Sequence, residues 1–255
     1  MDTADSVNIA LLAGDIMLSN GAETYRVEDT ARRILAALGQ ENAQAYVTAT
    51  GIFISAGVEP PITGIKRVKT RSYHMEKIAR VNDLSRGLSS GEIQCADAES
   101  ELIRIANLPP YPAALRITCS GVSSFCFCYM FGGLWRDSVC ALLCGLLVYF
   151  TLNLLSGRCV STFLSNIICG ALISVLTLAL LNLRLGVNMD KIIVGAIMPL
   201  VPGIAMTNAM RDILEGDFVS GLSRATEALV TAAAIAAGVG LILGGWLRIY
   251  GGFIQ

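Results

Sequence analysis

The chain has 255 residues, of which 54% are hydrophobic and only 15% are charged. Soluble domains average about 25% charged residues, so this composition excludes an ordinary soluble protein. The formal net charge of −1 also argues against nucleic-acid binding, because proteins of that class usually present a strongly basic surface.

The charged residues are concentrated in the first part of the chain. Residues 1–116 hold 12 of the 19 Lys and Arg residues and 14 of the 20 Asp and Glu residues. The proline-rich segment Leu108–Pro112 is a stiff boundary after which charges become sparse. The sequence therefore predicts a cytoplasmic α+β domain over 1–112 and a transmembrane five-helix domain over 113–255.

The first predicted domain begins with helical periodicity. Apolar residues recur at three- and four-residue spacing over 5–38, which predicts one amphipathic helix broken near Gly21. The chain changes character over 43–68, where the stretch AYVTATGIFISAGV (45–58) is rich in Val, Thr, Ile and Phe; this predicts two short strands, and a third strand is expected at 62–69. Helical patterns return near 74–86 and 95–107, and this order of elements favours a small α+β domain.

Five apolar runs follow, at 113–131, 134–155, 160–183, 189–207 and 224–250. About 20 apolar residues are needed to cross a bilayer, and the second, third and fifth runs meet this requirement easily. Arg116 weakens the first run. Pro199, Pro202 and Gly203 predict a bent or broken helix in the fourth.

The N-terminus lacks a positively charged region and a cleavage site, so no signal peptide is predicted. The N-terminal domain is therefore expected in the cytoplasm. Lys and Arg residues in the short loops do not favour either side of the membrane, so the orientation depends on this expectation alone.

The fourth run carries the first candidate site. Pro199, Pro202 and Gly203 free backbone groups, and discontinuous helices of this kind often form transporter sites. A simple kink is the alternative. The polar residues that follow are either part of a substrate path or a solvated loop: Asn208, Arg211, Asp212, Glu215 and Asp217. Among them, Asp212 paired with Arg211 or with Arg224 is the pair most expected to matter for function.

Glu227 opens the last apolar run and is a second candidate for the path, because intramembrane carboxylates usually face a cavity or a partner. The alternative is an interfacial ion pair with Arg224, one helical turn earlier. The same run carries small residues at four-residue intervals, which predict a close-packing face toward its own bundle or toward another subunit: Ala232, Ala236, Gly240 and Gly244.

In the N-terminal domain, Gly21, Ala22, Glu23 and Arg26 combine a glycine with alternating charge, and Glu28 follows. These residues predict either a polar site or surface salt bridges, which are worth under about 1 kcal/mol. Gly87–Gly91 matches G-x-S-x-G, but the only histidine, His74, precedes it, and the segment 81–92 is predicted to be a loop. No cofactor or metal motif is found, and the seven of the eight cysteines that follow residue 118 lie in apolar stretches without metal-ligand spacing.

Three segments resemble the threonine/serine exporter family. They are residues 14–39 (GDIMLSNGAETYRVEDTARRILAALG), 131–137 (FGGLWRD) and 198–229 (MPLVPGIAMTNAMRDILEGDFVSGLSRATEAL). The positions that carry the resemblance are Gly21, Ala22, Glu23, Pro199, Pro202, Gly203, Asn208, Asp212, Gly216, Gly221 and Arg224.

The resemblance implies a secondary transporter in the bacterial inner membrane that exports threonine, serine or dicarboxylates such as succinate. Short family members resemble the larger half of a two-protein system, so it also implies a smaller four-helix membrane partner in a homo- or hetero-oligomer. Two alternatives are a membrane-anchored hydrolase and a regulatory membrane subunit without its own transport path.

Overall fold

The computed structural model describes residues 2–69, 72–156 and 160–251. The chain divides into two compact units. The first, here called the N-terminal unit, contains Met1–Pro110 together with Gly203–Thr226. The second, called the helical unit, contains Tyr111–Pro202 and Glu227–Gln255.

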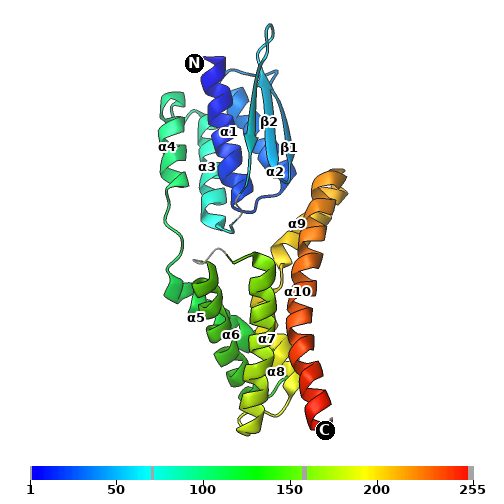
Figure 1. Ribbon diagram of the computed structural model, residues 1–255. Helices are drawn as coiled ribbons and strands as arrows, with labels where there is room; N and C mark the ends of the chain where they lie inside the picture. The colour runs from blue at the N-terminus through cyan, green and yellow to red at the C-terminus, as the bar shows by residue number, and fades with distance from the viewer. Residues whose placement is uncertain (1, 70–71, 157–159, 252–255) are drawn as a thin grey trace. The chain divides into compact units, whose positions relative to one another are not determined.

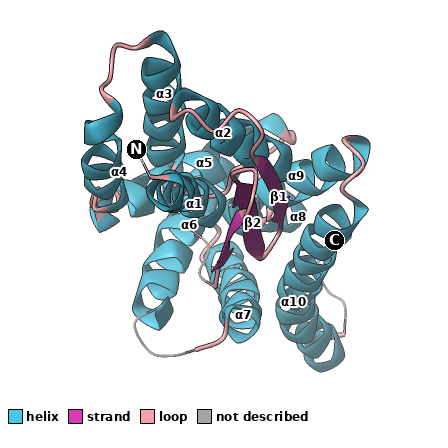
Figure 2. Ribbon diagram, turned by 90° about the horizontal axis from the view of Figure 1, so that it is seen from above, coloured by secondary structure: helices cyan, strands magenta, loops and turns pink. Residues whose placement is uncertain are grey.

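The N-terminal unit is built on a three-stranded antiparallel sheet with the strand order β1-β2-β3 (Figures 1 and 2). Helices α1 and α2 pack on the sheet, and α3 and α4 pack on these helices. The bounds are α1 Thr3–Ser19, α2 Thr24–Ala37, β1 Gln44–Thr48, β2 Gly51–Ala56, β3 Ile62–Arg67, α3 Met75–Ser90, the 3₁₀ turn η1 Cys95–Asp97 and α4 Ala98–Ala106.

Alternating side chains decide which face of the sheet is covered. Ile52 and Ile54 are fully buried beneath the helices, whereas the intervening Phe53 is exposed and lies beside Tyr46 of the paired strand. Gly64 of β3 allows α1 to approach, because a Cβ there would lie 2.6 Å from Leu11 Cδ1. The structure confirms the predicted three strands.

Two predictions for this unit have different outcomes. The break predicted near Gly21 is confirmed, because α1 ends at Ser19 and α2 begins at Thr24. The loop predicted at 81–92 is wrong, because α3 continues to Ser90 and ends at Gly91 in the left-handed region. The hydroxyls of Ser89 and Ser90 donate to carbonyls of their own helix, which is ordinary for serines in a last turn.

The remaining chain is helical. Among the described residues, four helices are long and apolar enough to cross a membrane, and a fifth span results if α8 and α9 count as one broken span. The bounds are α5 Ala113–Met130, α6 Trp135–Ser156, α7 Thr162–Asn182, α8 Met189–Ile197, the 3₁₀ turn η2 Met198–Leu200, α9 Gly203–Leu214 and α10 Phe218–Tyr250. The break at Pro199–Gly203 is confirmed. The predicted limits 207 and 224 are wrong, because α9 extends to Leu214 and α10 begins at Phe218.

Asp137 holds one end of the helical unit together. Its fully buried carboxylate accepts hydrogen bonds from the backbone N–H groups of Leu134, Val187 and Asn188 and from Asn188 Nδ2, at 2.7–3.1 Å. These donors fix the connection between α7 and α8 against the start of α6. A buried carboxylate with four donors is satisfied, so Asp137 is a structural residue.

Two glycines form the contact between α7 and α10. A Cβ at Gly170 would lie 2.6 Å from the carbonyl oxygen of Ile235, and one at Gly238 would clash with the carbonyl oxygen of Ile167. By contrast, added Cβ atoms at Gly240 and Gly244 would meet nothing within 4 Å among the described residues. The small-residue face therefore points away from its own chain at these two glycines.

Candidate functional site

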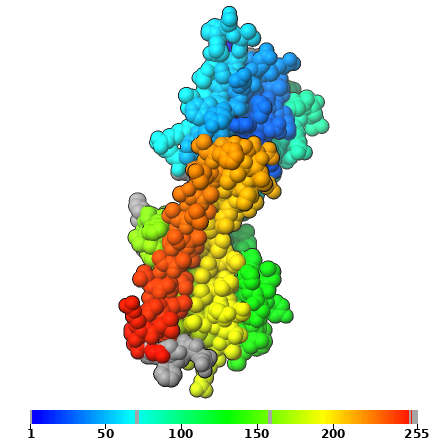
Figure 3. Space-filling model, turned by 90° about the vertical axis from the view of Figure 1, so that its right-hand side faces the viewer, coloured from blue at the N-terminus to red at the C-terminus, as the bar shows by residue number. Residues whose placement is uncertain are grey.

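The connection between α1 and α2, residues 20–23, packs against the hairpin formed by α9 and the first turns of α10. Both segments belong to the N-terminal unit although they are about 190 residues apart in sequence. In Figure 3 the orange atoms of this hairpin cover blue atoms of the first helices. We call the polar contacts between the two segments the junction.

The backbone at Gly21 sets the course of the connection. Its φ of +97° lies in the left-handed region, and an added Cβ would lie 2.7 Å from the ring of Tyr73. This conformation presents the Gly21 carbonyl to α9, where Asn208 Nδ2 donates to it at 2.9 Å. Both requirements explain a glycine at this position.

Asp212 of α9 acts as the cap of helix α2. Its Oδ1 atom accepts hydrogen bonds from Thr24 Oγ1 at 2.8 Å and from the Thr24 backbone N–H at 3.3 Å. Glu23, the residue at the N-cap position of α2, makes no capping hydrogen bond of its own. The carboxylate of a distant helix thus satisfies the positive N-terminal end of α2.

Arg224 of α10 completes this arrangement. Its Nε atom lies 3.1 Å from Asp212 Oδ2, and its Nη2 atom donates to the Ala22 carbonyl at 3.0 Å. Asp212 is fully buried and Arg224 is 7% exposed. Removing one partner of such a pair leaves the other charge buried without compensation, which typically costs about 3–5 kcal/mol.

Glu23 adds a second, more exposed pair. Its carboxylate contacts Arg211 of α9 and lies 3.3 Å from Arg26 Nε within α2. Both arginine side chains are more than 40% exposed, so solvent screens these pairs. We therefore assign most of the energy of the junction to Asp212 and Arg224.

Local sequence shapes the hairpin itself. Gly216 ends α9 in the left-handed region with φ +92°, and Asp217 caps α10 by accepting from the Ser220 backbone N–H at 3.2 Å. Gly221 lets the two helices meet, because an added Cβ would lie 2.9 Å from the Ala209 carbonyl oxygen. Ser220 Oγ accepts from the Ala49 N–H at 3.0 Å, which ties the hairpin to the end of β1.

The structure brings together most of the residues singled out from the sequence. Asn208, Arg211, Asp212 and Arg224 all contact the segment that contains Gly21, Ala22 and Glu23. The solvated-loop interpretation is wrong for Asn208 and Asp212, which are buried on a helix. The surface-salt-bridge interpretation fits Arg26 but not Glu23, which is 7% exposed.

Four predicted residues lie outside the junction. Pro199 belongs to η2 and Pro202 precedes α9, and both are assigned to the helical unit together with Glu227. Gly203 begins α9 and has open space around its Cα. The structure describes an ion pair between Arg224 and Asp212.

Sequence reasoning missed Thr24 and Ser220 as members of the junction. A threonine close to the start of a helical pattern commonly marks a helix N-terminus, and this was an available signal for Thr24. Nothing local marks Ser220, because its hydrogen bond to Ala49 joins residues 171 positions apart. Among the described residues no group of three His, Cys, Asp or Glu side chains is placed to hold a metal ion.

Comparison with known proteins identifies the family. A family model described as "Putative threonine/serine exporter" matches residues 8–245. The chain belongs to the threonine/serine exporter family. The match includes both sides of the junction and four of the five predicted spans in full, so it confirms the resemblance read from the three sequence segments.

Relatives within this family differ in length. A Corynebacterium glutamicum protein named "Threonine/serine exporter" is 25% identical over 93% of this chain but only 50% of its own length. A Mycobacterium tuberculosis protein named "Probable threonine/serine exporter" is 24% identical over 96% of this chain and 47% of its own length. The chain thus spans about half the length of these two relatives.

A third relative matches over nearly the whole length of both chains. The Escherichia coli K12 protein named "Probable succinate transporter subunit YjjP" is 24% identical over 93% of this chain and 93% of its own length. No solved structure shows significant similarity to the chain. Membership of the family and the apolar helices together establish a multi-pass membrane protein.

Glu28 provides a test of how closely the hairpin packs on the sheet. Burial raises the pKa of this carboxyl, and the negative charge of Asp217 in the hairpin raises it further. The hydrogen bond from Val47 N–H at 2.8 Å and the nearby Arg32 lower the pKa but do not cancel the rise. A raised pKa means that the folded state holds the proton more tightly than the unfolded state. Glu28 therefore contributes stability below its usual pKa, and this contribution is lost as pH rises through the folded-state pKa.

We predict that Glu28→Gln makes the stability of the protein depend less on pH. Glutamine keeps the acceptor for Val47 and carries no charge, so the variant should melt at a higher temperature than the wild type at pH 7. The difference should shrink as pH is lowered toward 4.5, the usual pKa of the group. Melting temperatures of the detergent-solubilised proteins across this pH range measure the effect, and a constant difference at all pH values would contradict it.

Proposed function

We propose that this protein is the membrane subunit of a secondary transporter that exports small metabolites from the bacterial cytoplasm. The substrates are amino acids such as threonine and serine or dicarboxylates such as succinate, as the names of the relatives suggest. The observation that carries the proposal is the junction, which attaches a non-membrane domain to the polar hairpin directly after a broken membrane helix.

The broken helix supplies polar backbone in an otherwise apolar region. Proline has no backbone N–H and disrupts the preceding turn, so Pro199 and Pro202 leave carbonyl groups without helical partners. Such groups are tolerated at membrane depth only where protein, water or a ligand satisfies them. We place the substrate path along this break, with Asn208, Arg211, Asp212, Arg224 and Glu227 as its polar residues.

The junction gives the N-terminal domain a mechanical role. Asp212 is bonded to α2 on one side and to Arg224 of α10 on the other, so α9 and α10 cannot separate from the domain without exposing a buried ion pair. A conformational change that moves the hairpin must therefore move the domain with it. We propose that this coupling opens and closes the path.

The alternatives have less support. A hydrolase would need an activated serine, but Ser89 and Ser90 both donate to their own helix. The family is one of exporters, so we propose that the protein is not an enzyme. A purely regulatory subunit would not require the broken helix, although only reconstitution separates it from a subunit with its own path.

We also propose that the N-terminal domain lies in the cytoplasm and that the helices cross the inner membrane. Ser90→Cys in a cysteine-free background tests this orientation, because position 90 is exposed at the end of α3. An impermeant thiol reagent should label this cysteine only after the cells are opened. Labelling of this cysteine in intact cells would place the N-terminal domain outside and contradict the proposed orientation.

The transport hypothesis is tested at Asp212. Asp212→Asn keeps the shape of the side chain but removes the negative charge that pairs with Arg224, so we expect export to fall by about tenfold or more. Release of labelled threonine, serine and succinate from cells measures export, and membrane levels of the variant establish that it is made. Asp190→Asn, at an exposed position, is the matched control. Normal export at normal protein level would rule out a charge-dependent role of Asp212.

The partner is a second part of this proposal. The two longer relatives contain a further half that this chain does not match, whereas the Escherichia coli relative is named as a subunit. We therefore propose that a smaller membrane protein of four helices completes the transporter. Reconstitution of this chain alone, with export at the full rate, would contradict an obligate partner.

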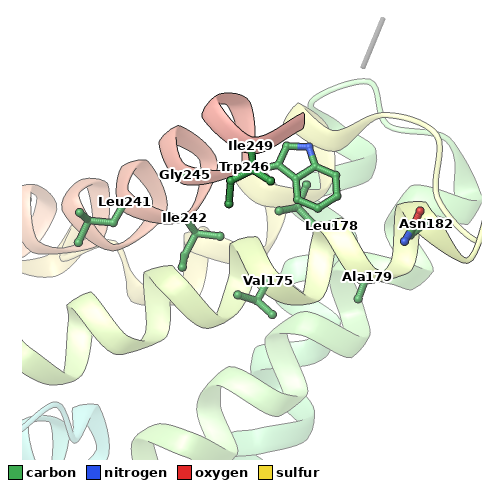
Figure 4. Close-up of a pocket in the computed structure, with 9 residues that line it drawn as sticks. All are labelled: Val175, Leu178, Ala179, Asn182, Leu241, Ile242, Gly245, Trp246 and Ile249. Atoms are coloured by element: carbon green, nitrogen blue, oxygen red, sulfur yellow. The ribbon is translucent and has the colours of Figure 1, made fainter. Parts of the chain in front are cut away.

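Helix α10 offers a surface for this partner. Gly240 and Gly244 face away from the chain, and small residues permit close helix approach in a membrane. The same helix also borders a groove of about 460 Å³ between α7 and α10, drawn in Figure 4, whose lining is mostly apolar: Val175, Leu178, Ala179, Asn182, Leu241, Ile242, Gly245, Trp246 and Ile249. Such a surface suits an apolar helix better than a charged metabolite.

We predict that Gly240→Leu weakens assembly with the partner. The bulk of leucine would hold the two helices apart, whereas Gly240→Ala adds a single methyl group and should assemble nearly normally. Co-expression with the neighbouring gene product, mild solubilisation and mass measurement report the complex. Equal yields of complex from the leucine and alanine variants would exclude this face as the interface.

A further inference from the structure

A cavity whose lining includes several polar side chains lies at one end of the helical unit. It has a volume of about 240 Å³ and is formed where α5 begins, α6 ends and α7 begins. Its size suits a small metabolite. Its lining carries one charged residue and five polar ones: Arg116, Tyr149, Asn153, Ser156, Thr162 and Ser165.

Arg116 does not use all of its N–H donors in hydrogen bonds with the described residues. Its Nη2 atom donates to Asn153 Oδ1 at a long 3.3 Å, and its Nε atom is buried without a hydrogen-bond partner among the described residues. No carboxylate of the described chain forms an ion pair with it. A guanidinium has five N–H donors, so most of them remain available to a ligand.

The common role of an arginine at the end of a membrane helix is to reach the lipid headgroups. That role leaves the guanidinium in water or among phosphates, whereas Arg116 lines a cavity and has its Nε atom buried. The planar fork of an arginine matches a carboxylate or a phosphate with two parallel hydrogen bonds. The surrounding hydroxyl and amide groups can bind the remaining polar groups of a small ligand.

We propose that Arg116 binds a carboxylate group of the exported metabolite in this cavity. The inference deepens the proposed function and rests on it, because it names the group by which the substrate is recognised. The cavity lies at the end of the helical unit where the chain enters it from Pro112. With the N-terminal domain in the cytoplasm, this is the end at which an exporter takes up its substrate.

The chemistry of the site fits both families of substrate. Amino acids and dicarboxylates share a carboxylate, and none of the described residues that line the cavity is acidic. An anionic lipid headgroup presents a phosphate to the same fork, so the test must separate a free carboxylate from a lipid.

The experiment measures binding of radiolabelled succinate and L-threonine to the purified full chain. It is made in detergent and in vesicles of phosphatidylcholine, with or without phosphatidylglycerol. Arg116→Gln should weaken binding of at least one probe by about tenfold or more, since hydrogen bonds to charged groups contribute roughly 1.5–3 kcal/mol. Arg116→Lys should bind with intermediate strength, and Arg184→Gln, an exposed arginine outside the cavity, should bind as the wild type does.

Each result bears on the proposal. Binding of neither probe by the wild type, or unchanged binding by Arg116→Gln, would overturn it. Binding that is abolished by phosphatidylglycerol, with no effect of Arg116→Gln in phosphatidylcholine, would assign the arginine to a lipid. If Arg116→Gln binds the probes normally while the wild type exports them, the proposed site is wrong and the transport function stands. If the wild type binds the probes but does not export them together with its partner, the transport function is contradicted independently of the site.

Discussion

A carboxylate and a guanidinium that are both withdrawn from water must satisfy each other, and Asp212 and Arg224 do so across the α9–α10 hairpin. The same carboxylate caps helix α2 through Thr24, and the same guanidinium donates to the carbonyl of Ala22. Two charges thus connect three segments: the start of α2, α9 and α10. Loss of the Asp212 charge would weaken both the cap of α2 and the ion pair with Arg224, and loss of the Arg224 charge would remove this partner from the buried Asp212 carboxylate.

Several other features follow from this constraint. Gly21 must adopt a positive φ so that the connection presents its carbonyls to the hairpin, and Gly221 must lack a side chain so that α9 and α10 can cross. Gly216 and Asp217 form the turn that brings Arg224 back to Asp212. These residues lie in the two segments that resemble the threonine/serine exporter family, which gives that resemblance a physical basis in one buried junction.

Much of the fold can be predicted from the sequence because its signals are local. The stretch 45–58, rich in Val, Thr, Ile and Phe, indicates strands, and Pro199 with Pro202 indicates a broken helix. The extent of α3 was misjudged, since Ser89 and Ser90 resemble loop residues but bond within a helix. Both halves of the junction could be picked out as polar motifs, yet their pairing could not, because contacts such as Thr24–Asp212 span 188 residues. The cavity at Arg116 was missed for the same reason: the sequence shows only an arginine that weakens an apolar run.

The central claim is that the N-terminal domain and the α9–α10 hairpin are held together by Asp212 and Arg224. Hydrogen–deuterium exchange on wild type and Asp212→Asn tests it most directly, because amide protection reports local opening. The account predicts that residues 21–27 and 205–214 lose protection together in the variant, while the interior of α6 and α7 keeps it. Unchanged protection in both segments, or loss confined to α9, would contradict the claim.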